Sequence, residues 1–142
     1  MQKENISLFF KEGSSEDYLA TVYEVCKETG SSAQQIEITV RMGFSKPSVM
    51  RGLRVLAQKD LVTIERNGNE NDVHLTDKGR ASAKKLLRRR RTVAAFLESL
   101  GLSEADAAAE AHLWEHGISE VTAKAMKTAL ARAKAPGQKQ FH

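Results

Sequence analysis

Two of the four histidines of this chain lie within the run His112-Leu-Trp-Glu115-His116. On an α-helix, positions i, i+3 and i+4 share one face, so His112, Glu115 and His116 are expected to point the same way. Two imidazoles and a carboxylate on one face supply three of the ligands of a transition-metal site. The spacing H-x-x-E-H is also typical of inverted zinc proteases, in which the glutamate acts as general base. The run therefore indicates either a protein that senses metal or a zinc protease, and the rest of the chain decides between them.

A cluster of three ligands needs a fourth from elsewhere in the chain, and Asp17 is the leading candidate. Asp17 also fits a second role, as the acidic member of a capping box that begins at Ser14. A hydrolase would instead need a further carboxylate ligand after His116. Glu120 is the only carboxylate there, one helical turn away rather than on a separate element. We therefore expect a binding protein and no enzyme.

The bulk composition is that of a globular protein with a mild basic bias. The 142 residues are 41% hydrophobic and 28% charged, with a net charge of +4 and a pI near 9.3. No apolar run approaches the roughly 20 residues of a membrane span, and the start lacks a signal-peptide pattern. The single cysteine, Cys26, agrees with a reducing compartment, so we expect a cytoplasmic protein. The positive charge permits nucleic-acid binding without requiring it.

The N-terminal half predicts three helices followed by a hairpin. Acidic residues after Ser14 begin the first helix, and Gly30 ends it. Ser31 and Ser32 give capping-box signals for a short second helix, which is expected to turn Ile36 and Val40 inward. A third helix follows Ser45, with Val49, Leu53 and Leu56 along one side. Two β-branched stretches, 61–66 and 73–75, flank the turn Asn67-Gly68-Asn69. This order is the winged helix-turn-helix plan.

The C-terminal half predicts only helices. A long helix is capped by Thr76 and runs to about Leu100, a second begins at Ser103 and carries the metal-like run, and a third begins at Ser119. The fold class is therefore mainly α, with an N-terminal winged helix-turn-helix followed by an all-helical dimerisation and metal-binding region. The expected parts are an N-terminal arm (1–13), a DNA-binding domain (14–76), a helical metal-binding and dimerisation domain (77–133) and a disordered tail (134–142).

The start of the third helix is the candidate DNA-reading surface, because the N-terminal residues of a recognition helix enter the major groove. Serine hydroxyls and a forked arginine can contact base edges there, and a proline can contact a thymine methyl group. The polar hairpin tip can lie along a phosphate strand. The candidate residues are Ser45, Lys46, Pro47, Ser48, Arg51, Arg54 and Arg66. The alternative is a winged helix that acts as a protein-interaction module.

Four stretches in this order resemble the diphtheria toxin repressor and manganese transport regulator family of metal-activated bacterial transcriptional repressors. They are Ser15-Glu-Asp-Tyr-Leu, Ser45-Lys-Pro-Ser-Val, Leu75-Thr-Asp-Lys-Gly-Arg and Trp114-Glu-His. The resemblance covers roughly Ser14 to Met126. It implies a repressor that binds double-stranded operator DNA as a homodimer when a divalent metal is bound. A constitutive, metal-independent winged-helix regulator is the alternative.

The resemblance also implies ligand roles, residue by residue. Asp17 stands where the manganese branch has its aspartate and the iron branch a methionine, and Glu115 and His116 match both branches. His112 matches neither, because the iron branch has a cysteine there and the manganese branch a glutamate. Ala20 and Arg90 replace ligands of a second metal. We expect one metal per subunit, with the Arg90 guanidinium taking the place of the missing cation.

The metal, oligomer and architecture expectations follow. Two oxygen and two nitrogen ligands suit Mn(II) or Fe(II), and Zn(II) or Co(II) are expected to bind at least as tightly in vitro. Iron-branch relatives carry an additional C-terminal SH3-like domain, which we do not expect here. Apolar faces on the last two helices favour a two-fold dimer.

Overall fold

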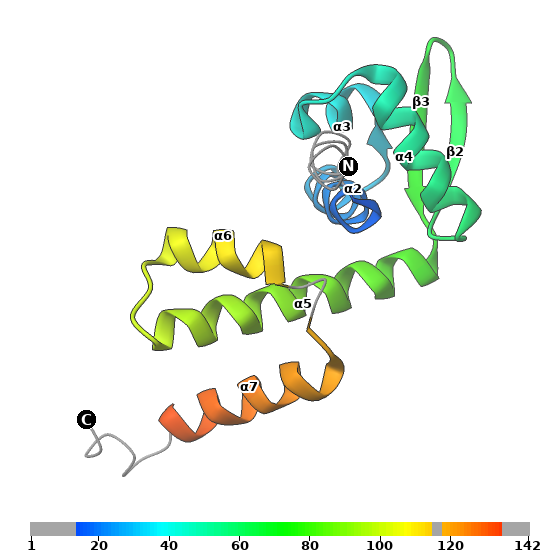
Figure 1. Cartoon of the computed structure of the whole chain (residues 1–142). Coiled ribbons are helices and arrows are strands. Elements are labelled where there is room, and N and C mark those ends of the chain that lie inside the picture. The colour runs from blue at the N-terminus through cyan, green and yellow to red at the C-terminus, as the bar shows by residue number, and fades with distance from the viewer. Residues whose placement is uncertain (1–13, 115–117, 135–142) are drawn as a thin grey trace, which may run out of the picture. The chain divides into compact units, whose positions relative to one another are not determined.

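The computed structural model describes residues 14–114 and 118–134. The predicted arm (1–13) and nearly all of the predicted tail (135–142) lie outside the described residues. The helices and strands follow in the order α2 (Ser15–Thr29), β1 (Ala33–Gln34), α3 (Gln35–Met42), α4 (Lys46–Gln58), β2 (Val62–Asn67), β3 (Glu70–Leu75), α5 (Asp77–Ser99), α6 (Glu104–Trp114) and α7 (Glu120–Lys134) (Figure 1). They form two compact units that meet between Lys84 and Lys85, within α5.

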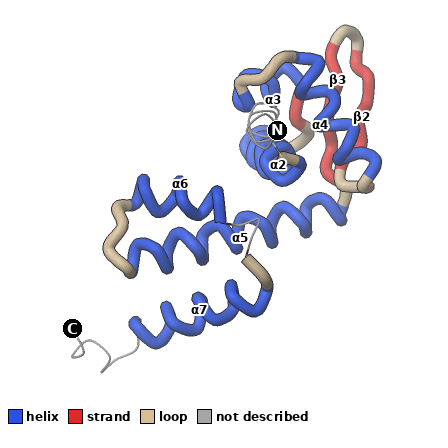
Figure 2. Tube along the Cα trace, in the orientation of Figure 1, coloured by secondary structure: helices blue, strands red, loops and turns tan. Residues whose placement is uncertain are grey.

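The first unit is a winged helix-turn-helix, as the sequence predicts. Helices α2, α3 and α4 pack against a three-stranded antiparallel sheet in which β3 lies between β1 and β2. Strands β2 and β3 form the wing, the two long red strands of Figure 2, and Gly68 makes its turn with a φ of +64°. The helix α4 is the predicted recognition helix.

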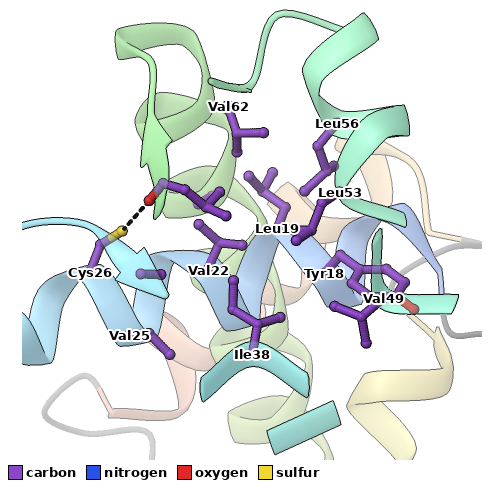
Figure 3. Packing of buried hydrophobic residues seen from close by; sticks show 13 residues of the cluster. Tyr18, Leu19, Val22, Val25, Cys26, Ile38, Val49, Leu53, Leu56 and Val62 are labelled. Atoms are coloured by element: carbon purple, nitrogen blue, oxygen red, sulfur yellow. Dashed lines mark hydrogen bonds between the residues drawn. The ribbon is translucent and has the colours of Figure 1, made fainter. Parts of the chain in front are cut away.

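The core of this unit is a cluster of apolar side chains. Side chains from α2, α3, α4 and the sheet converge on one cluster (Figure 3), among them the fully buried Val22, Ile38, Val49, Leu53 and Val73. Burial of each such side chain contributes about 1.5–3 kcal/mol. The predicted inward side of the third helix is therefore confirmed.

Side-chain caps fix where most of the helices begin. The hydroxyl oxygens of Ser14, Ser45, Thr76, Ser103 and Ser119 each accept a hydrogen bond from the backbone N–H three residues later, at 2.9–3.3 Å. Such a cap satisfies a helix N–H that has no partner within the helix. These five predicted helix starts are confirmed.

The prediction for the second helix is wrong in its cap and in its face. Gln34 precedes α3 and makes no side-chain cap, because residues 33–34 pair with β3 as the short strand β1. The buried positions of α3 are Gln35 and Ile38, so Ile36 and Val40 point to solvent and are 59% and 70% exposed. The strand β1 sets the register of α3, and it places a polar side chain where an apolar one was expected.

The second unit is helical throughout its described residues. Val93 and Leu97 of α5 pack with Ala107 and Ala111 of α6 and with Met126 of α7. Small residues on α6 allow the neighbouring helices to approach closely. The part of the chain that the structure describes contains no helix both long and apolar enough to cross a membrane.

Gly79 allows the first turn of α5 to lie directly against the backbone of Leu61. A Cβ atom at Gly79 would overlap the Leu61 carbonyl oxygen and lie 2.8 Å from its carbonyl carbon. The Thr76 N–H donates to the same oxygen at 3.1 Å, and the Thr76 hydroxyl donates to the carbonyl of Asp60 at 2.6 Å. The turn before β2 and the start of α5 are therefore fixed to each other through backbone atoms.

We expect Gly79→Ala to lower the free energy of unfolding by about 2 kcal/mol, because the overlap is with main chain that cannot rotate away. An ordinary glycine-to-alanine change in a helix has the opposite sign and stabilises by roughly 1 kcal/mol. Urea unfolding followed by circular dichroism measures the difference. Ser82→Ala in the same helix is the control and is expected to change little. A more stable Gly79→Ala protein would contradict this packing.

Candidate DNA-reading surface and metal-binding run

The recognition helix α4 presents a cationic face opposite its apolar one. Lys46, Arg51 and Arg54 are exposed, and α4 contains no acidic residue. Pro47 stands in the first turn, where its missing N–H breaks no helix hydrogen bond. The helix therefore offers positive charge and hydrogen-bond donors to an anionic partner.

Hydrogen bonds order the polar side chains at the start of α4. The Ser45 hydroxyl donates to Ser48 Oγ at 3.0 Å, and Arg51 Nη2 donates to the same Ser48 oxygen at 3.0 Å. These contacts place Arg51 over the first turn rather than away from it. Three of the predicted DNA-reading residues thus form one connected group.

The wing carries the remaining predicted residue, Arg66. Its Nε donates to the carbonyl oxygen of Gly68 at 2.9 Å, which folds the guanidinium back over the turn. Asn67 Nδ2 donates to Asp72 Oδ2 at 3.1 Å across the two strands. The exposed wing tip is therefore polar and locally braced.

One buried amide connects the wing to the recognition helix, and the sequence reasoning missed it. Gln35 is 1% exposed and is the buried polar residue of the described part of the chain. Its Oε1 accepts from Asn71 Nδ2 of β3 at 2.7 Å, and its Nε2 donates to the Lys46 carbonyl of α4 at 3.4 Å. Asn71 lies two residues before the buried Val73, so the alternation of β3 places it on the inward side of the strand. A polar residue at an inward position could have indicated that a buried polar partner exists.

The metal-like run is described only up to Trp114. His112 is exposed near the end of α6, and Trp114 Nε1 donates to Glu110 Oε2 at 3.1 Å, one helical turn earlier. Glu115 and His116 lie outside the described residues. Within residues 14–114 and 118–134, no three metal-ligating side chains converge. The described residues therefore do not test whether His112, Glu115 and His116 form a metal site.

Asp17 lies in the first turn of α2 and forms the capping box that was its second predicted role. Its N–H donates to Ser14 Oγ at 3.1 Å, and its Oδ2 accepts from the Ser14 N–H at 3.4 Å. The capping bonds use one carboxylate oxygen weakly and do not conflict with a ligand role, since a carboxylate can accept up to four hydrogen or coordinate bonds. Arg90, the predicted cation substitute, is half-buried on α5.

Comparison with known proteins gives consistent matches. Residues 76–136 match the family model of the iron dependent repressor, metal binding and dimerisation domain. The chain is 33% identical over 113 residues to the transcriptional regulator MntR of Escherichia coli O157:H7, covering 79% of this chain and 70% of that protein. It is 31% identical over 108 residues to the iron-dependent repressor IdeR of Mycobacterium tuberculosis (strain ATCC 25618 / H37Rv), covering 75% of this chain and 45% of IdeR.

Among solved structures, the manganese regulator SloR superposes with a TM-score of 0.71 and 28% identity. The match covers 83% of this chain and 54% of SloR, so the chain spans about half the length of that protein. These similarities include both the winged helix-turn-helix and the helices that follow it.

We expect Gln35→Leu to lower the free energy of unfolding by about 1–3 kcal/mol, because the Asn71 amide and the Lys46 carbonyl lose a buried partner. Thermal unfolding of the two proteins measures the loss. The neighbouring Gln34→Leu is a matched control, since Gln34 is exposed and its side chain does not cap α3. Equal stability of the two variants would show that the hydrogen bonds of Gln35 to Asn71 and Lys46 do not stabilise the fold.

Proposed function

The chain belongs to the diphtheria toxin repressor and manganese transport regulator family of metal-dependent transcriptional repressors, and we propose that it binds operator DNA as a homodimer when a divalent transition metal is bound. The observation that carries the proposal is the match of residues 76–136 to a metal-binding and dimerisation domain, joined to a winged helix-turn-helix with a cationic recognition helix. The family consists of transcriptional regulators, so the zinc-hydrolase alternative is excluded.

We assign DNA reading to residues 14–76 and metal binding and dimerisation to residues 77–133. The proposed DNA contacts are Ser45, Lys46, Pro47, Ser48, Arg51, Arg54 and Arg66. Support comes from the exposed cations of α4 and from the contact that holds Arg51 over the first turn. Arg51 is the proposed base-reading side chain, because a guanidinium can donate two hydrogen bonds to one guanine.

We assign the metal to Asp17, His112, Glu115 and His116. Two carboxylates and two imidazoles are ligand types that fit Mn(II) or Fe(II), and Zn(II) and Co(II) also bind such sets. SloR is a manganese regulator, IdeR is an iron-dependent repressor and MntR is a transcriptional regulator. The first two support a manganese or iron cofactor here. His112 is the residue that we expect to set the metal preference, since it supplies nitrogen in place of sulfur or oxygen.

The proposed ligands come from two parts of the chain. Asp17 belongs to α2, which carries the buried core of the DNA-binding unit, and His112 belongs to α6. When bound, the cation supplies the attraction that links these two helices. Binding at one hundred times the dissociation constant stabilises the bound conformation by about 2.7 kcal/mol. That energy is sufficient to shift a modest conformational equilibrium towards the form that fits DNA.

We propose that the second unit forms the homodimer contact. Exposed apolar side chains support this, since large apolar groups on a surface commonly mark an interaction site. In the described part of the second unit they are Leu100, Leu113, Trp114 and Val121. Dimerisation would place two recognition helices on one operator, as is usual for helix-turn-helix regulators. We also propose a cytoplasmic location.

The first test is metal-dependent operator binding, measured by fluorescence anisotropy with and without Mn(II), Fe(II) and Zn(II). We expect the wild-type affinity to rise by up to about a hundredfold with metal, and Asp17→Ala to abolish most of that rise because one ligand is lost. A metal-independent regulator would show the same affinity in every condition.

The structure offers a matched control for this variant. Ser14→Ala removes the same helix cap and is expected to cost about 1 kcal/mol of stability, but it keeps the Asp17 carboxylate. We therefore expect Ser14→Ala to retain the metal response. Loss of the response in both variants would assign the Asp17 effect to capping and would contradict its role as a ligand.

A second test counts metals. We expect purified protein to bind one Mn(II) per chain at saturation, because Ala20 and Arg90 stand where a second metal would need ligands. Equilibrium dialysis with metal analysis gives the number. Saturation at two per chain would show that Arg90 does not replace a cation.

A further inference from the structure

The second unit has a groove between α5 and α7 that is lined mainly by cationic side chains. Its volume is about 500 Å³, and its charged lining residues are Lys85, Arg88, Arg89, Glu120, Lys124 and Lys127. None of these residues belongs to the metal-ligand set or to the DNA-reading surface. Val121 of the proposed dimer contact also lines the groove, but the function proposed above gives no role to the cations gathered there.

Helix geometry places the cations in two facing rows. Lys85, Arg88 and Arg89 are spaced i, i+3 and i+4 on α5, and Lys124 and Lys127 are spaced i and i+3 on α7, so each set shares one helix face. Two sets of contacts hold α5 and α7 together. Glu120 at the start of α7 forms ion pairs with α5, and Met126 further along α7 packs in one cluster with Val93 and Leu97 of α5. The α5 residues that line the groove run from Lys85 to Thr92, which is a length of about 10 Å along the helix.

The groove concentrates the charge of the chain. Its five cations and one carboxylate leave an excess of four positive charges, which equals the net charge of +4 of all 142 residues. Acidic and basic residues are balanced in number over the rest of the sequence. Like charges this close repel one another, so an anion bound among them would relieve that repulsion.

Glu120 shows how the groove holds an anionic group. Its Oε1 lies 2.9 Å from Lys85 Nζ and 2.7 Å from Arg89 Nη2, and these two cations hold the pKa of the carboxyl below its usual range. Arg88, Lys124 and Lys127 line the same groove beyond this contact. One internal carboxylate thus neutralises part of the charge, and most of the excess faces the groove.

We propose that this groove binds a small anion that carries two or three linked phosphate groups. The length of about 10 Å suits a short phosphate chain, and the two rows of cations provide donors on both of its sides. Guanidinium groups bind phosphate oxygens through paired hydrogen bonds, and ammonium groups bind them as point charges. The bound anion would compete with the Glu120 carboxylate for Lys85 and Arg89.

Titration of the full chain with sodium tripolyphosphate, without added divalent metal, tests the proposal. We expect saturable binding at one site per chain in isothermal titration calorimetry, with amide NMR shifts confined to α5 and α7. Lys124→Glu with Lys127→Glu is expected to weaken binding about tenfold or more, because two attractions become repulsions. The charge-matched pair Lys27→Glu with Lys59→Glu, exposed in the first unit, is expected to change binding little.

A second pair of variants tests the competition and avoids charge reversal in the groove. Glu120→Gln is expected to tighten binding about threefold, since the competing carboxylate is removed. Glu104→Gln, at the first turn of α6, removes the same charge from a helix start outside the groove. Equal effects of the two variants, or of the two charge reversals, would overturn the proposal.

The source of the phosphate groups is tested in the same titration. A short DNA duplex without an operator is added as a competitor at equal phosphate concentration. We expect tripolyphosphate to bind the groove more tightly than the duplex does. Tighter binding of the duplex at α5 and α7 would identify the ligand as nucleic-acid backbone and would overturn the proposal of a small anion.

Discussion

The geometry of the proposed DNA-reading surface depends on the burial of one amide. Gln35 occupies a position inside the first unit where a polar group without partners would cost about 1–3 kcal/mol. Its two hydrogen bonds go to Asn71 in the wing and to the Lys46 carbonyl at the start of the recognition helix. An apolar side chain of similar size would fill the space but would not select these partners. The buried amide therefore specifies how the wing and the recognition helix meet, and the apolar cluster around it supplies the stability.

Much of the fold could be predicted because its signals are local. Capping residues at Ser45 and Thr76 and the Asn67-Gly68 turn act within four residues, so the sequence alone places those helix starts and the wing. The face of α3 could not be predicted in this way. Its register is set by the pairing of Ala33 with Val73, forty residues along the chain, and local periodicity carries no information about that contact.

The predicted DNA-reading face and the predicted metal site differ in how much of the chain each depends on. The DNA-reading face follows from one helix, since its exposed cations and its buried valine and leucines alternate within α4. The metal set needs Asp17 together with residues almost a hundred positions later, and spacing within α6 says nothing about that distance. The resemblance to a family supports Asp17 as the fourth ligand, and the capping box around Asp17 shows that one carboxylate can serve the local structure as well.

Net charge alone indicates little about what this protein binds, because the distribution of the charge is uneven. The excess of four positive charges is accounted for by the groove between α5 and α7, which leaves equal numbers of acidic and basic residues elsewhere. The recognition helix is nevertheless cationic, because its three cations share a helix without any carboxylate. Attraction to phosphates falls off over about 8 Å at physiological salt, so separation of charge on the scale of a helix matters more than the total. The two cationic surfaces differ in the shape of ligand that they suit. On α4, Arg51 and Arg54 are exposed along a single helix, whereas the groove has cations from two helices on either side of one cavity.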